Sequence, residues 1–238
     1  METEKYLEQL KTCKTEQEFK NIWNPNKFNW RDYSYLLCKF CSKYFKIWWN
    51  PDKFNWNSSD WLCHYCSKYF DIWWNSDKFN WNSSDWLCHY CSTYFHIWWD
   101  SEKFNWVYYS DYLCEYCSKY FNIWWNSEKF NWWNSECLCQ YCSKYINIWW
   151  NPDMIKWDWC SYYLCEYCSD YFNIWWDPNM FNWYLFSFYL CEYCSKYFKI
   201  WWDSEKFNWK YVEFLKKYCQ DYKYIWGKDY IKWKLKGA

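Results

Sequence analysis

Apolar and polar residues follow a helical period in a block that recurs along the chain. Counting from Leu113, apolar residues stand at positions 0, 1, 3, 4, 7, 8, 10, 11 and 12, with Ile123 at position 10, and polar residues at positions 2, 5, 6 and 9. At about 100° per residue the polar positions fill a narrow arc, whereas a two-residue alternation fails. The block predicts an amphipathic helix whose wide apolar face is suited to burial between two neighbours.

This block is one copy of a tandem repeat. A Cys-x-x-Cys motif followed by Ile-Trp-Trp recurs seven times at a step of 25 or 26 residues. A Ser before each motif and a closing Trp after it are 22 positions apart in every copy, so the length variation falls between the Trp and the next Ser. We expect a fixed block from Ser to Trp and a tolerant linker between blocks. The serines are Ser34, Ser59, Ser84, Ser110, Ser135, Ser161 and Ser187, and the closing tryptophans are Trp56, Trp81, Trp106, Trp132, Trp157, Trp183 and Trp209.

Capping signals divide each repeat into two predicted helices. Ser110 is the expected N-cap of the long helix, with Asp111 in its first turn. After the Trp-Trp pair, an Asn or Asp precedes Pro or Ser and usually an acid, as in Asn50-Pro51-Asp52, which is typical of a helix start. A second, short helix is therefore expected over Lys-Phe-Asn-Trp. The predicted fold is all-α, an α-solenoid of seven 25–26-residue helical-hairpin repeats.

Both ends of the chain keep only part of the repeat. Residues 1–30 retain Ile22-Trp23 but lack Cys-x-x-Cys, and residues 210–238 retain Tyr218-Cys219 and Trp233. Because end units of an open stack have one neighbour, altered copies are expected there. The predicted organisation is a cap at 1–30, seven repeats over 31–209 (31–56, 57–81, 82–106, 107–132, 133–157, 158–183 and 184–209) and a cap at 210–238.

Two structural alternatives stay open. Thr15 and Glu18 form a capping-box pattern that starts a helix in the middle of the first degenerate copy. A corresponding break after the second Cys of each motif, at Ser42 and its equivalents, would give three short helices per repeat. Aromatic residues also favour strands, which keeps a β-solenoid as an alternative.

Composition and charge exclude several classes of protein. Of the 238 residues, 29 are Trp, 28 Tyr and 18 Phe, so the chain has ample apolar surface to bury and is not an ordinary disordered protein. The formal net charge is zero, which argues against an electrostatic nucleic-acid or anionic-membrane binder. A possible lysine row on the polar face is expected to be solvated. It comprises Lys43, Lys68, Lys119, Lys144 and Lys196.

The N-terminal residues give no targeting signal. They are charged from the start, and no run of the chain approaches 18 apolar residues. We therefore expect a protein that is neither secreted nor transmembrane and that resides inside a cell.

The repeated cysteines have three interpretations. They are small buried residues of a close-packed core, ligands of zinc, or a disulfide ladder that would make a redox protein. The pairs are 21 or 22 residues apart and no interleaved His completes a site, so the packing interpretation is favoured and no cofactor is expected. The zinc candidates are Cys38, Cys41, Cys63, Cys66, Cys88, Cys91, Cys114, Cys117, Cys139, Cys142, Cys165, Cys168, Cys191 and Cys194.

No set of residues indicates catalysis, so we expect a non-enzymatic protein. His64, His89 and His96 take positions that are polar in other copies and are expected on the exposed face. The Asn before most closing tryptophans is expected to form a side-chain ladder. The variable aromatic residues near the linkers are the candidates for contact with a protein partner or for self-association. They are Tyr108, Tyr109, Trp133, Trp159, Phe186 and Phe188.

The segment from Leu113 to Trp132 resembles the tandem Trp-rich repeats of uncharacterised proteins from mimivirus-like giant DNA viruses. The resemblance extends over roughly residues 20–209 and is most distinctive in Trp-Trp-Asn/Asp-Pro/Ser-Asp/Glu-Lys-Phe-Asn-Trp. It implies a viral protein that resides inside the cell, in host cytoplasm or a virion, and it brings no known activity to this chain. Residue pattern and resemblance together predict a repeat scaffold or structural component, with a metal or redox protein as the alternative.

Overall fold

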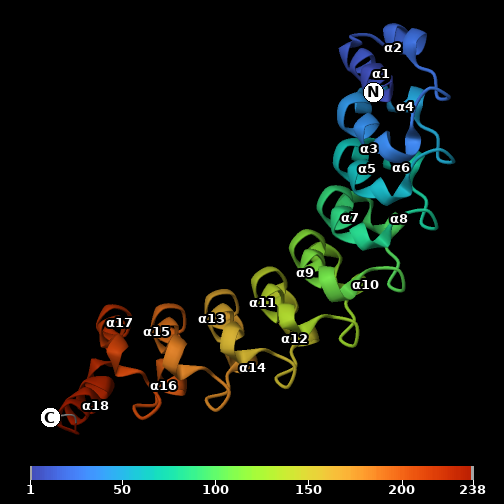
Figure 1. Cartoon of the computed structure of the whole chain (residues 1–238). Coiled ribbons are helices and arrows are strands. Elements are labelled where there is room, and N and C mark those ends of the chain that lie inside the picture. Colours follow the sequence, from blue (N-terminus) through green and yellow to red (C-terminus); the bar gives the residue numbers. More distant parts are fainter. Residues whose placement is uncertain (1, 237–238) are drawn as a thin grey trace. The chain divides into compact units, whose positions relative to one another are not determined.

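The computed structural model describes residues 2–236, and every regular element in this range is helical (Figure 1). The chain divides into two compact units, unit 1 over Met1–Tyr120 and unit 2 over Phe121–Ala238. Within each unit, repeats of about 25 residues follow one another and each long helix packs on the next, so each unit is a helical solenoid. None of the helices in residues 2–236 is both long enough and apolar enough to span a membrane.

Unit 1 begins with α1 (Glu2–Thr12) and α2 (Glu16–Ile22) and continues as a stack of long and short helices. Figure 1 places the long helices in chain order on one side and the short ones beside them. The long helices are α3 (Trp30–Cys41), α5 (Ser59–Cys66), α7 (Ser84–Cys91) and α9 (Trp106–Cys117), and the short helices are α4 (Phe45–Trp48), α6 (Phe70–Trp73) and α8 (Phe95–Trp98).

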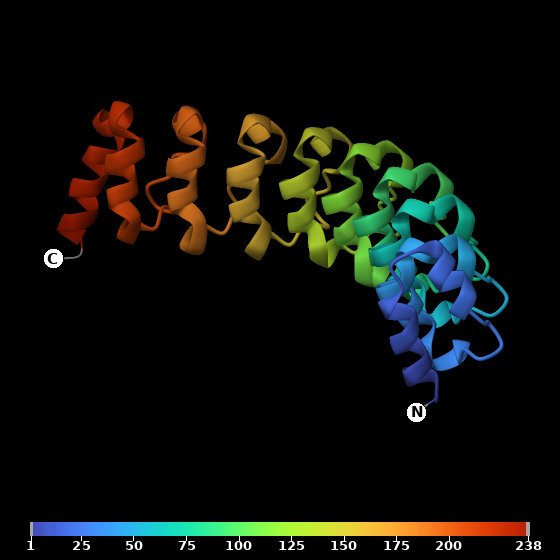
Figure 2. The same ribbon diagram turned by 90° about the horizontal axis from the view of Figure 1, so that it is seen from above.

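Unit 2 repeats the same arrangement and ends in α18 (Lys223–Lys236). Its long helices lie side by side in chain order in both views (Figures 1 and 2). They are α11 (Ser135–Cys142), α13 (Trp157–Tyr167), α15 (Trp183–Tyr193) and α17 (Val212–Tyr218), and the short helices are α10 (Phe121–Trp124), α12 (Ile146–Trp149), α14 (Phe172–Trp175) and α16 (Phe198–Trp201).

Each repeat breaks after the second Cys, as the alternative with three short helices predicts. Cys41 has non-helical angles (φ −121°, ψ 17°), and a 3₁₀ turn over Ser42–Tyr44 separates α3 from α4. The buried indole Nε1 of Trp48 donates to the Cys41 carbonyl at 2.8 Å. In an equivalent copy the same carbonyl also accepts the backbone bond of the 3₁₀ turn, from the N–H of Tyr171 to the Cys168 carbonyl at 2.9 Å. The indole bond ties the second arm of the hairpin to the end of the long helix. The same bond recurs from Trp73, Trp98, Trp149, Trp175, Trp201 and Trp226.

The predicted second helix over Lys-Phe-Asn-Trp is wrong. Residues 51–54 form a turn, in which the Asn50 side-chain oxygen accepts from the backbone N–H groups of Asp52 (3.0 Å) and Lys53 (3.2 Å). The Asn-Pro-acid signal therefore caps an Asx turn rather than a helix. The closing Trp56 clamps this turn, because its Nε1 donates to the carbonyl of Pro51 at 2.9 Å.

The length variation between repeats lies in the first turn of the long helix. Where four steps separate the closing Trp from the Ser, as in Trp157 and Ser161, the chain is α-helical from the Trp. Where three steps separate them, as in Trp56 and Ser59, a 3₁₀ turn (Trp56–Ser58) precedes the α-helix. The tolerant segment is thus helical, and one extra residue is absorbed as the difference between a 3₁₀ and an α turn.

The predicted N-cap at Ser110 is wrong, since this Ser lies inside α9, wholly buried, and its hydroxyl donates to the carbonyl of Trp106. In most copies the cap is the Asn before the closing Trp, as at Asn55, whose side chain accepts from the N–H of Asn57. The repeated Ser instead joins successive helix starts: the backbone N–H of Asn55 donates to Ser34 Oγ at 3.1 Å, and that of Asn182 to Ser161 Oγ at 3.2 Å.

Aromatic stacking joins neighbouring repeats in the core. The ring of Phe45 lies parallel to that of Tyr69 in the next copy, with centroids 4.8 Å apart, and Phe198 stacks in the same way on Tyr222 at 4.6 Å. The degenerate ends join this stack, because Phe19 of α2 packs on Tyr44 at 4.4 Å. The capping box that starts α2 is confirmed: Thr15 Oγ1 accepts from the N–H of Glu18 at 3.1 Å, and Glu18 accepts from the N–H of Lys14 at 2.7 Å.

Candidate functional site

Three of the six predicted contact residues are strongly exposed and three are partly buried. The exposed fractions are 70% for Tyr108, 72% for Trp133 and 69% for Trp159. Tyr109 is half-buried and donates from its hydroxyl to the carbonyl of Asn82 at 2.9 Å.

Phe186 and Phe188 are also half-buried. Phe188 packs against Tyr211 and Phe214, with ring centroids 4.7 and 4.9 Å away, so it serves the contact between repeats. Of the six residues, the strongest candidates for contact with another molecule are therefore Tyr108, Trp133 and Trp159.

Trp133 and Trp159 line one pocket of unit 2, together with Met180 of the following turn. The pocket has a volume of about 440 Å³. Lys156 also lines it and holds its Nζ 4.5 Å from the centre of the Trp133 ring, in cation–π geometry. We call this surface the Trp133–Trp159 groove.

The framework of the repeat does not require either exposed indole. The preceding residue Trp132 is buried and clamps its own turn through a 2.9 Å bond from Nε1 to the Ser127 carbonyl. At the position of Trp133, two copies in unit 1 have Asn57 and Asn82. At the position of Trp159, two steps after the closing Trp, other copies have Asp32 and Leu185. The groove is therefore an addition to the fold.

An exposed row of isoleucines was missed by the sequence analysis. Ile123, which the helical pattern places on the buried face, is 51% exposed, and Ile148 is 55% exposed. The reason lies in the break: Cys142 and Tyr145 both leave helical geometry (ψ 19° and 15°), so one helical wheel cannot be carried from α11 into α12. The other exposed members are Ile22, Ile72, Ile97, Ile174 and Ile200.

The cysteines form lines of buried thiols within each unit. All 18 are thiols, and all except Cys137 are buried. The first Cys of one motif contacts the second Cys of the next: the thiol of Cys194 donates to the carbonyl of Cys165 at 3.9 Å, and that of Cys168 to the carbonyl of Cys139 at 3.8 Å.

The buried environment suppresses thiol ionisation. Burial raises the pKa of Cys41 to about 12 and that of Cys38 well above its usual range. A thiol in this state is a poor nucleophile. Among residues 2–236, no three His, Cys, Asp or Glu side chains converge as a metal site would require.

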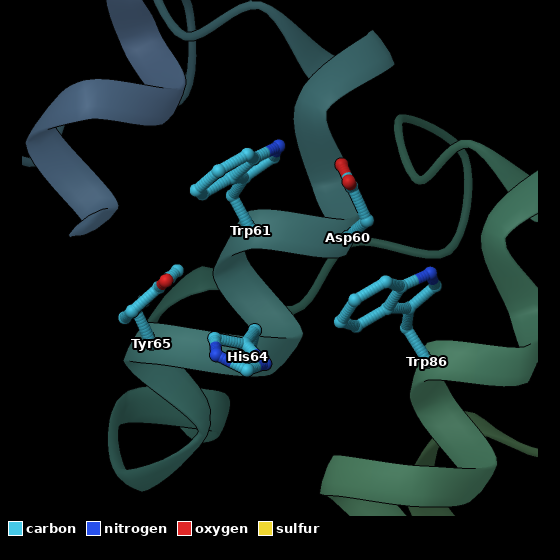
Figure 3. Close-up of a pocket in the computed structure, with 5 residues that line it drawn as sticks. All are labelled: Asp60, Trp61, His64, Tyr65 and Trp86. Atoms are coloured by element: carbon cyan, nitrogen blue, oxygen red, sulfur yellow. The ribbon is translucent and has the colours of Figure 1, made fainter.

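One histidine departs from the prediction. His64 is half-buried rather than exposed, because its ring packs against Tyr65 (4.2 Å), Tyr90 (4.5 Å) and Trp86 (5.6 Å). It lines a small pocket of unit 1 with Asp60 and Trp61 (Figure 3). No sequence signal distinguishes this copy from the next, which has the same Ser-Asp-Trp-Leu-Cys-His-Tyr-Cys segment.

The repeated lysines and asparagines make contacts within and between repeats. Lys43 and Lys119 lie over the tyrosine that follows each, 4.7 and 4.8 Å from the ring centre. The amide of Asn55 donates to the carbonyl of Arg31 at 2.6 Å, and that of Asn208 to the carbonyl of Tyr184 at 2.7 Å. Asn55 and Asn208 therefore bond to backbone of the preceding repeat, whereas the amide of Asn182 donates to the carboxylate of Asp158 at 3.4 Å.

Comparison with protein-family models, with curated proteins and with solved structures yields no match. The fold and the candidate site consequently rest on the geometry of this chain alone.

Proposed function

We propose that this chain is a non-enzymatic scaffold that binds a protein partner through the Trp133–Trp159 groove of unit 2. The observation that carries the proposal is the pairing of two indoles, each about 70% exposed, on one pocket. Neither indole has a role in the repeat framework. Protein interfaces are enriched in Trp at the positions that contribute most to affinity. The cell interior is the proposed location. A viral origin rests on the resemblance of the repeats.

The free energy gained by burying the two exposed indoles favours contact with a partner over exposure to solvent. An aromatic side chain buries roughly 150–250 Å² when covered, and apolar burial is worth about 25 cal/mol per Å². Covering the exposed parts of Trp133 and Trp159 would therefore contribute several kcal/mol. Met180, 44% exposed, extends the apolar surface, and Lys156 beside Trp133 adds a cation at its rim. Asp158 also lines the groove, so Lys156 is not the only charge there. The favoured partner therefore presents apolar side chains to the groove.

The chain supplies substitutions that suit its own fold. Trp133→Asn introduces the residue found at Asn57, and Trp159→Asp the residue found at Asp32. Val107→Asn is a matched control, because Val107 is 66% exposed and also follows a closing Trp, but it lies in unit 1. We expect bait carrying Val107→Asn to capture the same host-lysate proteins as wild type and the double variant to lose them. Equal capture by all three baits, or none by wild type, would contradict the proposal.

Self-association through the same groove is the other outcome of this test. Light scattering on purified protein separates the two, since a dimer held by the groove would dissociate in the double variant but not in Val107→Asn. A concentration-dependent mass in wild type would assign the groove to a second copy of this chain.

The paired thiols between repeats keep a metal or redox function as a second candidate. Contacts such as Cys38 to Cys66 place two sulfurs together, and metal or disulfide chemistry would act there. Metal analysis and thiol titration of freshly purified protein decide the matter. Packing alone predicts no bound zinc, rapid reaction of Cys137 only, and 18 reactive thiols after unfolding. Stoichiometric zinc or oxidised pairs would favour the second candidate.

A further inference from the structure

A small pocket in unit 1 lies between α5 and α7, remote in sequence from the groove of unit 2. Trp61 and Trp86 stand on either side of it, His64 lies between them and Asp60 is at one end (Figure 3). Its volume is about 220 Å³. The rings support one another: Trp61 stacks on Tyr65 at 5.5 Å, and the His64 ring meets the Trp86 ring edge-on at 5.6 Å.

The chemistry of the lining favours a cation. The faces of indole and phenol rings are negative and attract ammonium groups, and the effect is largest for Trp. Asp60 adds a carboxylate, and no Lys, Arg or His among the described residues forms an ion pair with it. Burial raises the pKa of this carboxyl, although the backbone N–H groups of Trp61 and Asp60 itself oppose the rise. His64, which lines the same pocket, also lowers the pKa of Asp60. The pocket thus combines π faces with a carboxylate.

A lysine of the preceding repeat already makes a cation–π contact with the indole of Trp61. Lys39, which does not line the pocket, holds its Nζ 5.7 Å from the centre of the Trp61 ring. An ammonium group is therefore compatible with the surroundings of this indole.

Other ligand classes fit the pocket less well. A volume of about 220 Å³ is below the roughly 300–1,000 Å³ of pockets that hold cofactors or drug-sized ligands, and is of the size of one side chain. An anion would be repelled by Asp60. A bound metal ion would need more ligands, since no three metal-binding side chains meet among residues 2–236.

We propose that the pocket lined by Asp60, Trp61 and Trp86 binds an alkylammonium group, namely the side-chain ammonium of a lysine or methyl-lysine on a protein partner. The site goes beyond the groove of unit 2 and does not depend on it. It would give the scaffold a second point of contact with a charge requirement that the groove lacks.

Ligand-observed NMR on the full chain tests the site with defined probes. Choline carries a quaternary ammonium group, and 3,3-dimethyl-1-butanol has nearly the same shape without the charge. Nα-acetyl-lysine methylamide, with and without Nε-trimethylation, separates a lysine source from a small free amine. We expect choline and both lysine probes to bind, with the lysine probes at least as tight as choline, and the neutral alcohol to bind about threefold or more weakly.

Variants locate the binding. Asp60→Asn keeps the shape of the side chain and removes its charge, and Trp86→Leu introduces the residue found at Leu36. Each is expected to weaken binding of the ammonium probes by about threefold or more, whereas Trp86→Tyr, which matches Tyr112, retains part of it. Circular dichroism verifies that each variant folds, and Asp60→Asn carries the test should Trp86→Leu fail to fold.

The outcomes separate this site from the groove. Trp133→Asn should leave probe binding unchanged, and Asp60→Asn should leave the groove intact. Equal affinity of choline and the neutral alcohol, or wild-type affinity in Asp60→Asn, would overturn the assignment. Binding of choline but not of either lysine probe would overturn the lysine source.

Discussion

In unit 1, asparagine follows two of the closing tryptophans, at Asn57 and Asn82, whereas in unit 2 the equivalent of Asn57 is Trp133. Beneath this difference both units have the same interior, with a Trp indole bonded to a Cys carbonyl in repeat after repeat. The comparison separates two kinds of position. Residues that face the neighbouring repeat are held constant by packing, while the first turn of each long helix can vary in both length and chemistry.

The largest expected effect comes from the shared interior. Trp175→Ala in unit 2 and Trp73→Ala in unit 1 should each lower the free energy of unfolding by about 3–5 kcal/mol, because each leaves a cavity and removes the indole hydrogen bond to a Cys carbonyl. Both indoles are 1% exposed. Chemical denaturation measures the loss, and Trp133→Asn is the control. A similar loss in the control would show that the exposed indole belongs to the framework.

A smaller effect is expected from the buried serines. In Ser161→Ala the backbone N–H of Asn182 loses its acceptor, and in Ser84→Ala that of Asn105 does. Each variant should be less stable by about 1–2 kcal/mol, within the usual cost of an unmet hydrogen bond. Thr93→Ala, at an exposed site, should change stability little. If Ser161→Ala and Ser84→Ala matched Thr93→Ala, the serines would not link the repeats.

The smallest expected effect on stability comes from the ionisation of a partly buried carboxyl group in unit 1. Burial raises the pKa of Asp85, and the neighbouring carboxylates of Asp60 and Asp111 add to the rise. The folded state therefore holds this proton more tightly than the unfolded state, so ionisation destabilises the fold at neutral pH and the penalty fades as the pH falls toward the ordinary value of 3.8.

Asp85→Asn should consequently raise the Tm by about one to two degrees at pH 7 and by less near pH 4. Thermal unfolding at both pH values measures this difference. Asp153→Asn, at an exposed position of unit 2, should show no such pH dependence. A lower Tm for Asp85→Asn at pH 7 would reverse the sign of the argument.

Much of the fold follows from spacing. The constant 22 positions between Ser34 and Trp56 identify a rigid block, and the helical period of its first half predicts the long helices. Thr15 and Glu18 also indicate correctly that short helices start inside a copy. These features are local, or repeat often enough to be compared within one sequence.

The rest depends on contacts that one sequence does not reveal. The sequence around Asn50 is the same whether Asn50 caps a helix or an Asx turn. The Asx turn is stabilised by the indole of Trp56, which donates to the carbonyl of Pro51. The break after Cys142 changes which way Ile148 faces, so its exposure could not be read from the pattern of α11. Of the groove, the residues Trp133 and Trp159 were predictable as variable aromatics, but their shared pocket was not.

The central claim is that the repeat interior tolerates no change in length, whereas the first turn of the long helix does. A pair of single-residue deletions in unit 2 tests this claim most directly. Deleting Asp158 leaves three steps between the closing Trp and the Ser, as in the copies that begin with a 3₁₀ turn. Deleting Asp170 shortens the span between Cys168 and Trp175 and breaks the 2.8 Å bond that joins them. Chemical denaturation should give a loss of about 1 kcal/mol for the first deletion and more than about 3 kcal/mol for the second. Equal losses from the two deletions would contradict the account.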